Sequence, residues 1–503
     1  MKGRFVLGVD FGGGASKATL LSANGEVIAT SIKEYHTYYP KNGWAEQRPE
    51  DFYNALIYNV SSILKDSGVS PEDIRAIALD AATHTAVLLD EKGESVRNVI
   101  HWTDRRSVKE AEYLKKNYND MIMELSYNAP SALWTLPQLM WLRENEFENY
   151  NKISRIFFVK DYIRNRLTGD FVTDSIEAMG SMLVDAKENC WSKQLCNLAG
   201  INVSMLPEIV DPLDIAGHIT DKAAKETGLS ENTLVVVGST DTVMEVYASG
   251  AIDVGYATVK LATAGRICPV TTAPQKSPLF FNYKHIVPGL WYPGTGTKSC
   301  ASSYRWYRDV LGEYEILEGE RQEKDAYFLL DKAAGAVAPG ADGLFFHPYL
   351  LGEITPYLDD SLRGSFVGIS SFHQKGHFNR AVLEGVAYSL KDCFEVIKQS
   401  GIGIHTASII GGGAKSPLWS QIVADMLGIP LVKTKRSDSS LGSAMLAGVA
   451  TGMFSTFADS TEKCVKVEKV IYPDATVNQI YEKGFITYKK IHDVLEKVYH
   501  TID

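Results

Sequence analysis

The sequence predicts an α/β protein of two lobes, in which helices cover β-sheets. Short apolar segments typical of strands alternate with segments whose apolar residues recur at helical spacing, and this alternation is typical of α/β sheets. With 503 residues the chain is long enough for two large domains. Glycines near residues 250–255 indicate a boundary, so we expect an N-terminal lobe, 1–249, and a C-terminal lobe, 250–503, with a cleft between them.

The expected elements follow in chain order. Mainly apolar runs predict strands over 5–9, 18–21, 74–79, 234–237, 257–262 and 407–410. Apolar residues at intervals of three and four predict helices over 52–64, 383–397 and 481–498, and a further helix that begins at Ser416-Pro417. Proline is favoured in the first turn of a helix, which supports the start at Ser416.

Composition and charge argue against several classes of partner. The net charge of −10 is unfavourable for binding nucleic acid or an anionic membrane, because both need basic surfaces. Six cysteines without a CxxC pair indicate reduced thiols rather than a zinc site or a disulfide framework. The apolar run after Lys2 and Arg4 ends at Asp10, which is too short for a signal peptide or a spanning helix. We therefore expect a cytoplasmic protein that binds neither nucleic acid nor a membrane.

A triple glycine at 411–413 follows an apolar run and precedes the helix that begins at Ser416. Glycine lets the backbone approach a ligand closely, and a helix N-terminus presents free N–H groups that attract anions and polar ligands. The pattern therefore predicts a nucleotide site. A tight strand-to-helix turn without a ligand is the alternative.

Asp10 lies where the first strand ends and the glycine turn 12–14 begins. This places a carboxylate beside backbone N–H groups that could hold phosphate oxygens, and Lys17 on the returning strand could add a positive charge. Because a carboxylate and a phosphate repel each other, such a site requires Mg²⁺. An ordinary hairpin with an exposed aspartate and a surface lysine is the alternative.

Asp241, in the segment GSTDT, is delivered by an apolar strand to a loop of small residues. Phosphoryl transfer to an alcohol needs the hydroxyl positioned and its proton accepted, and a carboxylate within hydrogen-bonding reach does both. The alternative is an aspartate that caps the helix over 243–248. Pairing with Asp10 favours the catalytic interpretation.

Three residues of the N-terminal half could line a polyol pocket: Trp44 in GWAEQ, His84 in ATHTAVLL and Asp104 in HWTDRR. A carboxylate, an imidazole and a flat aromatic ring are the groups that commonly hold sugars. A structural histidine and a packing tryptophan are the alternatives.

Patterns for other enzyme classes fail. GTGTKS at 294–299 lacks the glycine directly before Lys298 that a P-loop needs. A GxGxxG after a strand and an HExxH are both absent, so a Rossmann dehydrogenase and a zinc hydrolase have no support.

Motifs along almost the whole chain resemble those of the FGGY carbohydrate kinases, and most closely the xylulokinases. VLGVDFGGGASKATLL is similar to the family's first phosphate loop, and IALDAATHTAVLLDEKG to the strand that bears the substrate histidine. VVVGSTDT is similar to the segment with the catalytic base, and GGGAKSPLWSQIVADMLGIPLV to the adenine-binding end. Each motif alone is weakly specific, whereas their order and spacing together are highly specific.

The resemblance implies two ribonuclease-H-like lobes, as in hexokinase, actin and Hsp70, which close on ATP in the second lobe and sugar in the first. It implies that Asp10 organises Mg²⁺ and that Asp241 is the base. The implied sugar contacts are Trp44, Thr83, His84, Asp104 and Thr242. The implied nucleotide or phosphate contacts are Gly12, Gly13, Gly14, Lys17, Thr263, Gly265, Gly412, Gly413 and Ala414. A homodimer is implied by family analogy alone.

Four segments depart from the xylulokinase pattern. Thr83 and Thr85 flank His84 where Met and Gly are usual, and Thr242 follows the catalytic aspartate in place of Asn. Gly13 and Gly14 stand where Thr and Ser are usual, and LATAG at 261–265 replaces LGTSG. Each lost hydroxyl removes a phosphate hydrogen bond, worth on the order of 1 kcal/mol.

We therefore expect an ATP- and Mg²⁺-dependent sugar kinase, with D-xylulose as the first substrate to test. Another kinase of the family, acting on gluconate, ribulose, a deoxy-ketose or a tetritol, is an alternative, and gluconate would need Arg105 or Arg106 at its carboxylate. A nucleotide-gated binding module of the actin type is a second alternative. A member that binds sugar without transferring phosphate is a third.

Overall fold

The computed structural model describes residues 3–502, which form two compact units. Unit 1 comprises residues up to 252, 272–291 and 436–466, and unit 2 comprises 253–271, 292–435 and residues from 467 onward. The expected boundary at 249–250 lies next to the point where the chain first leaves unit 1. Two later segments of the chain return to unit 1, so a division at one sequence position does not describe the units.

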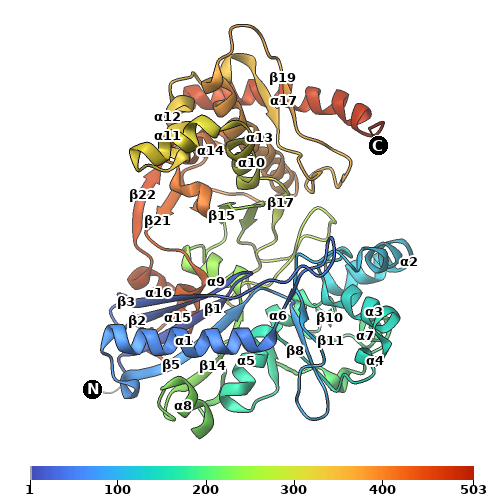
Figure 1. The fold of residues 1–503 in the computed structure, drawn as a ribbon, viewed down its shortest axis with the longest axis vertical. Helices are drawn as coiled ribbons and strands as arrows, with labels where there is room; N and C mark the ends of the chain where they lie inside the picture. The colour runs from blue at the N-terminus through green and yellow to red at the C-terminus, as the bar shows by residue number, and fades with distance from the viewer. Residues whose placement is uncertain (1–2, 503) are drawn as a thin grey trace. The chain divides into compact units, whose positions relative to one another are not determined.

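A six-stranded mixed sheet forms the centre of unit 1 (Figure 1). Its strands lie in the order β13 (Ile215–His218), β14 (Leu234–Thr240), β5 (Ile74–Ala81), β1 (Phe5–Phe11), β2 (Ala15–Ser22) and β3 (Val27–Glu34). The three central strands β14, β5 and β1 are parallel, and the outer pairs are antiparallel. Because both faces of the central strands are covered, these strands are apolar runs rather than alternating ones.

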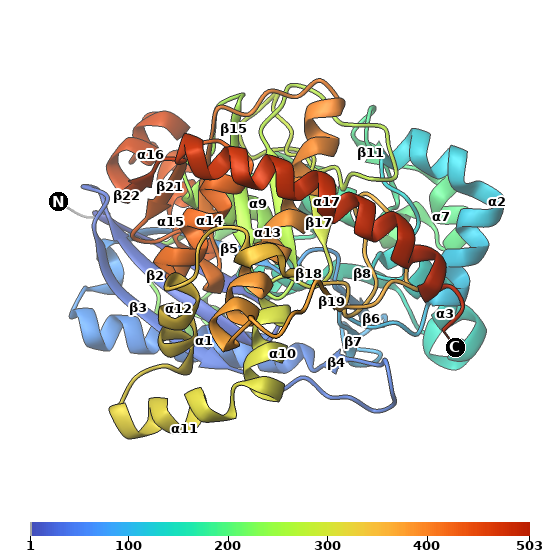
Figure 2. The same ribbon diagram turned by 90° about the horizontal axis from the view of Figure 1, so that it is seen from above.

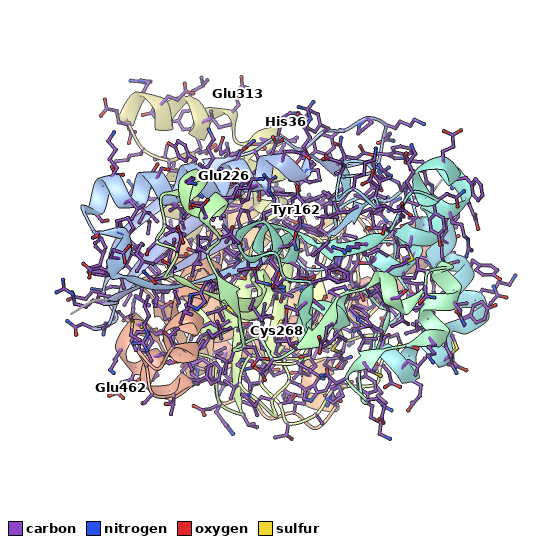
Figure 3. All side chains as sticks on the ribbon, turned by 90° about the horizontal axis from the view of Figure 1, so that it is seen from below. His36, Tyr162, Glu226, Cys268, Glu313 and Glu462 are labelled. Atoms are coloured by element: carbon purple, nitrogen blue, oxygen red, sulfur yellow. The ribbon has the colours of Figure 1, made fainter. Side chains whose placement is uncertain are left out.

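One face of this sheet packs against α1 (Pro49–Ser67) and α5 (Val159–Thr168), and α8 (Asp221–Thr227) lies beside α1. Alternate β1 residues, Leu7, Val9 and Phe11, point to this side and belong to the same buried cluster as Phe52 of α1 and Ile163 of α5. At the edge of this layer, a hydrogen bond of 2.7 Å runs from the α1 tyrosine at position 53 to Glu226 of α8, which is labelled in Figure 3.

The opposite face of the sheet is covered by α15 (Ser439–Ala450), with α9 (Asp241–Ala248) beside it. The helix comes so close that a Cβ atom at Gly8 of β1 would lie 2.0 Å from the Ser440 carbonyl oxygen. A Cβ atom at Gly442 of α15 would lie 2.2 Å from the Met244 carbonyl oxygen of α9. Both glycines are therefore required by close backbone packing, and residues of β1 and β5 that point to this side face α15.

Smaller elements complete unit 1. The further helices are α2 (Val108–Ser126), α3 (Thr135–Asn145), α4 (Phe147–Tyr150), α6 (Ser175–Gly180), α7 (Lys193–Ala199) and α16 (Phe457–Cys464). The further strands are β4 (Glu46–Gln47), β6 (Ala86–Leu89), β7 (Val99–Ile100), β8 (Arg155–Phe158), β9 (Val172–Asp174), β10 (Val184–Asp185), β11 (Cys190–Trp191) and β12 (Glu208–Val210). They form four two-stranded ribbons: β4 with β7, β6 with β8, β9 with β12, and β10 with β11.

The sheet of unit 2 repeats the topology of unit 1. Its order is β17 (Thr295–Thr297), β16 (Gly265–Pro269), β15 (Tyr256–Leu261), β20 (Thr406–Ile410), β21 (Leu431–Thr434) and β22 (Val467–Ile471). The strands β15, β20 and β21 are parallel, and the outer pairs are again antiparallel. Two sheets of one topology confirm the prediction of two α/β lobes.

The helices of unit 2 are α10 (Ala301–Leu311), α11 (Glu313–Gln322), α12 (Ala326–Gly335), α13 (Lys375–Gln399), α14 (Pro417–Leu427) and α17 (Ala475–Tyr499), and a ribbon is formed by β18 (Phe345–His347) and β19 (Ser365–Val367). Figure 2 shows α17 lying across this helical layer. Tyr388 of α13 is in ring contact with Tyr481, Phe485 and Tyr488 of α17, which joins the two longest helices of the unit. Aromatic contacts therefore hold the C-terminal helix on unit 2.

Among residues 3–502, no helix combines the length and the apolar character needed to cross a membrane.

Candidate active site

Three aspartates lie at the carboxyl ends of the parallel strands of unit 1. Asp10 and Asp80 are register partners on β1 and β5, and Asp241 follows directly on β14 as the first residue of α9. The carboxyl ends of parallel strands in an open α/β sheet are where ligands bind. The structure thus brings together the two acids predicted from the sequence and adds a third, Asp80, that the sequence interpretation missed.

Asp10 and Asp80 form a pair of facing carboxyl groups. The two side chains lie within hydrogen-bonding reach of each other, and Asp80 is completely buried. Burial first, and then the negative charges of Asp241 and Asp438, together raise the pKa of Asp10 from 3.8 to about 7. Burial, followed by the charge of Asp10, holds the pKa of Asp80 well above its usual range. Two such groups cannot both be ionised unless a cation compensates them.

The donor set at this pair fits a divalent cation. Among the described residues, no hydrogen-bond donor reaches Oδ1 of Asp10 or Oδ1 of Asp80, and both atoms are buried. Carboxylate oxygens without donors are the ligands that Mg²⁺ and Mn²⁺ prefer. The residues present therefore fit the Mg²⁺ that the sequence predicts at Asp10.

Asp241 is partly exposed, and hydroxyl groups surround its carboxylate. Its Oδ1 atom lies 3.2 Å from Thr242 Oγ1 and 3.5 Å from Thr83 Oγ1. The predicted alternative, that Asp241 caps the following helix, is wrong, because α9 begins at Asp241 and the N-cap position is held by Thr240. The carboxylate thus lies among hydroxyl groups at the end of β14 and is not the cap of α9.

The glycine turn after β1 is fastened by its carbonyl groups. Tyr35 Oη donates a hydrogen bond to the Gly12 carbonyl oxygen, and Gln47 Nε2 donates to that of Gly13 at 2.8 Å. Gly13 and Gly14 are exposed, and a Cβ atom at Gly14 would meet no atom within 4 Å. The turn thus leaves open space at Gly14, whereas a Cβ atom at Gly13 would lie 3.1 Å from His101 Nε2.

Lys17 does not present a free charge at this turn. Its ammonium group forms an ion pair of 2.9 Å with Asp438, which is located directly before α15. Asp438 also accepts a hydrogen bond of 2.6 Å from Ser440. In this structure the positive charge of Lys17 is compensated, so a phosphate contact by Lys17 would require this ion pair to open.

His84 lies in a strained turn after β5, with a φ of 59°. Its backbone N–H donates to Glu177 at 2.6 Å, its carbonyl oxygen accepts from Thr135 at 2.7 Å, and its ring packs edge-on against Trp134. A left-handed conformation in a non-glycine residue persists only where the surroundings enforce it. The backbone of the predicted sugar histidine is therefore fixed from both sides.

A buried ionic network lies beneath this turn. Lys160, Asp161, Arg164, Asp174 and Glu177 are all completely buried. Lys160 pairs with Asp161 and Asp174, and Arg164 pairs with Asp161. Burial holds the pKa of Glu177 well above its usual range. The sequence signal for this network is the row of charged residues in the segment VKDYIRNRLTGDFVTD. It does not predict a buried network, because charges on a predicted helix ordinarily indicate a solvent-exposed face.

This network holds the end of β14. Asp174 accepts a hydrogen bond of 2.8 Å from Ser239, and Arg164 donates one of 2.6 Å to the Val237 carbonyl oxygen. Both contacts lie within four residues of Asp241. The network therefore positions the strand end that carries the predicted base.

Asp104 has a structural role in this geometry. Its two oxygens accept four hydrogen bonds, from the Ala45 N–H, the Arg106 N–H and the Arg106 Nε and Nη2 groups. A carboxylate has about four acceptor positions, so none remains for a sugar. Arg106 also pairs with Glu46 and lies 3.8 Å from the centre of the Trp44 ring. The predicted sugar contact of Asp104 is thus not supported, whereas Trp44 is partly exposed on top of this cluster.

Unit 2 contains a pocket of about 490 Å³ beside the triple glycine. Gly412 and Gly413 line it, together with the aromatic residues Tyr304, Tyr327 and Phe328. Flat aromatic walls and a glycine floor suit a planar base. The sequence interpretation found the glycines but missed the aromatic residues, which lie on α10 and α12, about 85 to 110 residues earlier in the chain.

The glycines of this turn have different roles. Gly411 has a φ of 91°, and a Cβ atom there would lie 2.6 Å from the Leu261 carbonyl oxygen. A Cβ atom at Gly413 would lie 2.8 Å from the Trp419 ring, whereas Gly412 has open space. Ala414 is buried rather than in the pocket. The turn thus needs glycine at two positions for packing, and at Gly412 the backbone is exposed to a ligand.

The turn between β15 and β16 carries the last two predicted phosphate contacts. Thr263 is exposed, and its carbonyl oxygen accepts hydrogen bonds from the Cys300 N–H and the Ser302 hydroxyl. Gly265 is buried in β16, and a Cβ atom there would lie 2.7 Å from the Thr297 methyl group. Thr263 is therefore available to a ligand, whereas Gly265 permits close strand packing.

Two family models match the chain. The model of the N-terminal domain of the FGGY family of carbohydrate kinases matches residues 5–247, and that of the C-terminal domain matches 259–451. The second match includes 272–291 and 436–451, which the structure groups with unit 1.

Curated relatives carry two different names. A xylulose kinase of Bacillus subtilis (strain 168) is 31% identical over 97% of this chain and 97% of its own length. A gluconokinase of the same organism is 31% identical over 90% of this chain and 89% of its own length.

Solved structures show the same pair of names. The ligand-bound xylulose kinase from Lactobacillus acidophilus matches with a TM-score of 0.91 at 25% identity, covering 99% of this chain and 100% of that chain. A gluconate kinase from Lactobacillus acidophilus matches with a TM-score of 0.91 at 26% identity, covering 99% of each chain.

Proposed function

Because this chain belongs to the FGGY family of carbohydrate kinases, and is therefore a sugar phosphotransferase, we propose that it transfers the γ-phosphate of ATP to a hydroxyl group of a ketopentose. D-xylulose is the first candidate, with D-xylulose 5-phosphate as the product. The observation that carries the proposal is the partly exposed carboxylate of Asp241 beside the carboxyl pair of Asp10 and Asp80 at the strand ends of unit 1.

Asp241 acts as the general base in this proposal. Its carboxylate accepts the proton of the attacking hydroxyl group, which raises the nucleophilicity of the oxygen as the phosphoryl group arrives. Thr83 and Thr242 hold the carboxylate through their hydroxyl groups. His84 follows β5 in a fixed turn, and in this proposal its ring holds a second sugar hydroxyl.

Asp10 and Asp80 would hold Mg²⁺, which when bound neutralises charge on the phosphate groups. The glycine turn 12–14 lets phosphate oxygens approach the backbone at Gly14, which has open space, whereas the His101 ring lies close to Gly13. In unit 2, the pocket of Tyr304, Tyr327 and Gly412 would hold the base of ATP. In this proposal unit 1 binds the sugar and the phosphate groups, and unit 2 binds the base of ATP.

The charges around the sugar residues favour a neutral substrate. Arg106, one of the two arginines that could hold the carboxylate of gluconate, is already compensated by Asp104 and Glu46, and its side chain is buried. Arg105 is exposed and is the remaining candidate. Because a gluconokinase matches nearly as much of the chain as the xylulose kinase does, gluconate is the second candidate.

The test is coupled release of ADP from Mg-ATP across a panel of ketoses, polyols and gluconate, with a control that contains no sugar. We expect the largest kcat/KM with D-xylulose. A larger value with gluconate would replace the substrate, and we would then expect Arg105→Gln to reduce that value. Binding of ATP without turnover on any acceptor would contradict the kinase assignment for this chain.

A further inference from the structure

We propose that unit 1 binds a divalent cation by itself, in the absence of nucleotide, because Asp80 supplies a second carboxylate beside Asp10. In the proposed function Mg²⁺ could arrive bound only to ATP, and one carboxylate would be enough to contact it. A paired site would instead hold the cation on the protein before ATP binds. The inference concerns the same site as the proposed function, but it is tested by binding rather than by turnover.

The first step of the argument is the register of the sheet. Asp10 of β1 and Asp80 of β5 are directly paired in a parallel ladder, so both side chains point to the same face. That face is the one covered by α15, because Gly8, two residues before Asp10, packs against Ser440. The two carboxyl groups are therefore held side by side by backbone geometry, without depending on a flexible loop.

The second step is the set of hydrogen bonds at Asp80. Ser443 of α15 donates a hydrogen bond of 2.5 Å to Oδ2 of Asp80. The other oxygen, Oδ1, is buried and receives no donor from the described residues, and the same is true of Oδ1 of Asp10. Ser443 thus fixes the rotation of the Asp80 carboxylate and leaves one oxygen on each aspartate for a ligand. A buried carboxylate oxygen without a partner is costly, and a bound cation removes that cost.

The third step is the distribution of charge. Three further carboxylates, Asp241, Asp438 and Glu245, contribute negative charge at Asp10. Lys17 lies on the neighbouring strand opposite Asp10, but its ammonium group is paired with Asp438. The excess of negative charge favours a small cation of high charge over a single proton.

A shared proton is the competing explanation for the pair. Two facing carboxyl groups can hold one proton between them, and the pair would then be a structural hydrogen bond with no ligand. The variant Asp80→Asn separates the two explanations, because asparagine keeps the size and shape of the side chain. It mimics a protonated acid, so it preserves a hydrogen bond to Asp10 but removes a carboxylate ligand.

The experiment is a titration of the nucleotide-free full-length protein with Mn²⁺, followed by electron paramagnetic resonance of the free ion. We expect one Mn²⁺ per chain, and a loss of affinity of at least about 10-fold in Asp80→Asn and in Asp10→Asn, a loss typical of perturbed metal sites. The control variant is Asp221→Asn, which removes an exposed carboxylate paired with Lys225 and should leave the affinity unchanged.

Thermal unfolding supplies a second readout that reports whether the variants fold. We expect Mn²⁺ to raise the melting temperature of the wild type, because a ligand that binds the folded state stabilises it. Without metal, Asp80→Asn should melt at the same temperature as the wild type or higher, since repulsion within the pair is removed, and Mn²⁺ should shift it less.

Three results would overturn the inference. The first is a wild type that binds no Mn²⁺ at millimolar concentration without nucleotide. The second is Asp80→Asn that binds Mn²⁺ with the affinity of the wild type, and the third is the same result for Asp10→Asn. Turnover in the sugar panel together with any of these results would leave the proposed function intact, so the two failures are distinguishable.

Discussion

The two units have sheets of identical strand order and direction, yet the residues at corresponding strand ends differ. In unit 1, Asp10 near the end of β1 pairs with Asp80 near the end of β5. The corresponding pair in unit 2 is Lys260 on β15 and Ile410 on β20. Beyond these ends, unit 1 continues into His84, whereas unit 2 continues into the triple glycine 411–413. One topology therefore carries carboxylate chemistry in one copy and a pocket for a planar ligand in the other.

The comparison teaches that the fold supplies positions and the strand-end residues supply chemistry. The carboxyl ends of parallel strands are open to a ligand in both units, because the strands stop there and the turns are short. In unit 1 the turn residues add charge and hydroxyl groups. In unit 2 they add space, which aromatic side chains of the inserted helices then enclose.

The largest expected effect is a loss of turnover without a loss of nucleotide binding. It would separate the chemistry of unit 1 from the nucleotide site of unit 2. Asp241→Asn keeps the shape of the side chain but removes the base, so kcat should fall by about 10²- to 10⁴-fold. Nucleotide affinity should stay within about twofold, because unit 2 is unaltered. Fluorescence of Trp419, which lines the pocket, can report nucleotide binding. A variant that retains turnover would remove Asp241 from the mechanism.

A smaller effect concerns Glu353, a buried acid of unit 2 that we expect to be structural. Burial raises its pKa from 4.5 to about 7, and four donors, the Thr297 and Ser389 hydroxyls and two backbone N–H groups, partly oppose this rise. The folded state therefore holds this proton more tightly than the unfolded state. Stability should fall as the pH rises from 4.5 to about 7, by up to about 3 kcal/mol from this group.

Glu353→Gln tests this interpretation, since glutamine cannot ionise. The melting temperature of the variant should depend less on pH over this range than that of the wild type, while the KM for sugar stays the same. Equal pH dependence in both proteins would show that another group is responsible.

The smallest effect compares neighbouring glycines of the nucleotide turn. Gly411→Ala should lower the free energy of unfolding by about 1–3 kcal/mol, because alanine is strained at a φ of 91° and its Cβ atom would contact the Leu261 carbonyl oxygen. Gly412→Ala, the matched control, has open space and should change stability by less than about 1 kcal/mol. Urea unfolding measures both. Equal losses would mean that the turn adapts and that packing does not distinguish the two positions.

Local patterns were sufficient for much of the fold and for part of the site. The apolar strands and the glycine turns after β1 and β20 were predicted, because each is contiguous in the sequence. Asp80 was missed as a site residue, because its significance comes from its register with Asp10, which lies 70 positions earlier on another strand. Asp104 was interpreted as a sugar contact because the hydrogen bond from the Ala45 N–H depends on tertiary structure.

Helix α15 has a consequence for the synthesis of this chain. Its residues are made about 200 positions after the first segment of unit 1 ends, yet the close contact of Gly8 with Ser440 shows that the sheet is shaped to receive it. At the usual speed of translation, the α15 face of the nascent sheet would stay uncovered for roughly 10–40 s. The first 252 residues should therefore depend on chaperones while the ribosome completes the chain, and a fragment that ends there should aggregate when expressed alone.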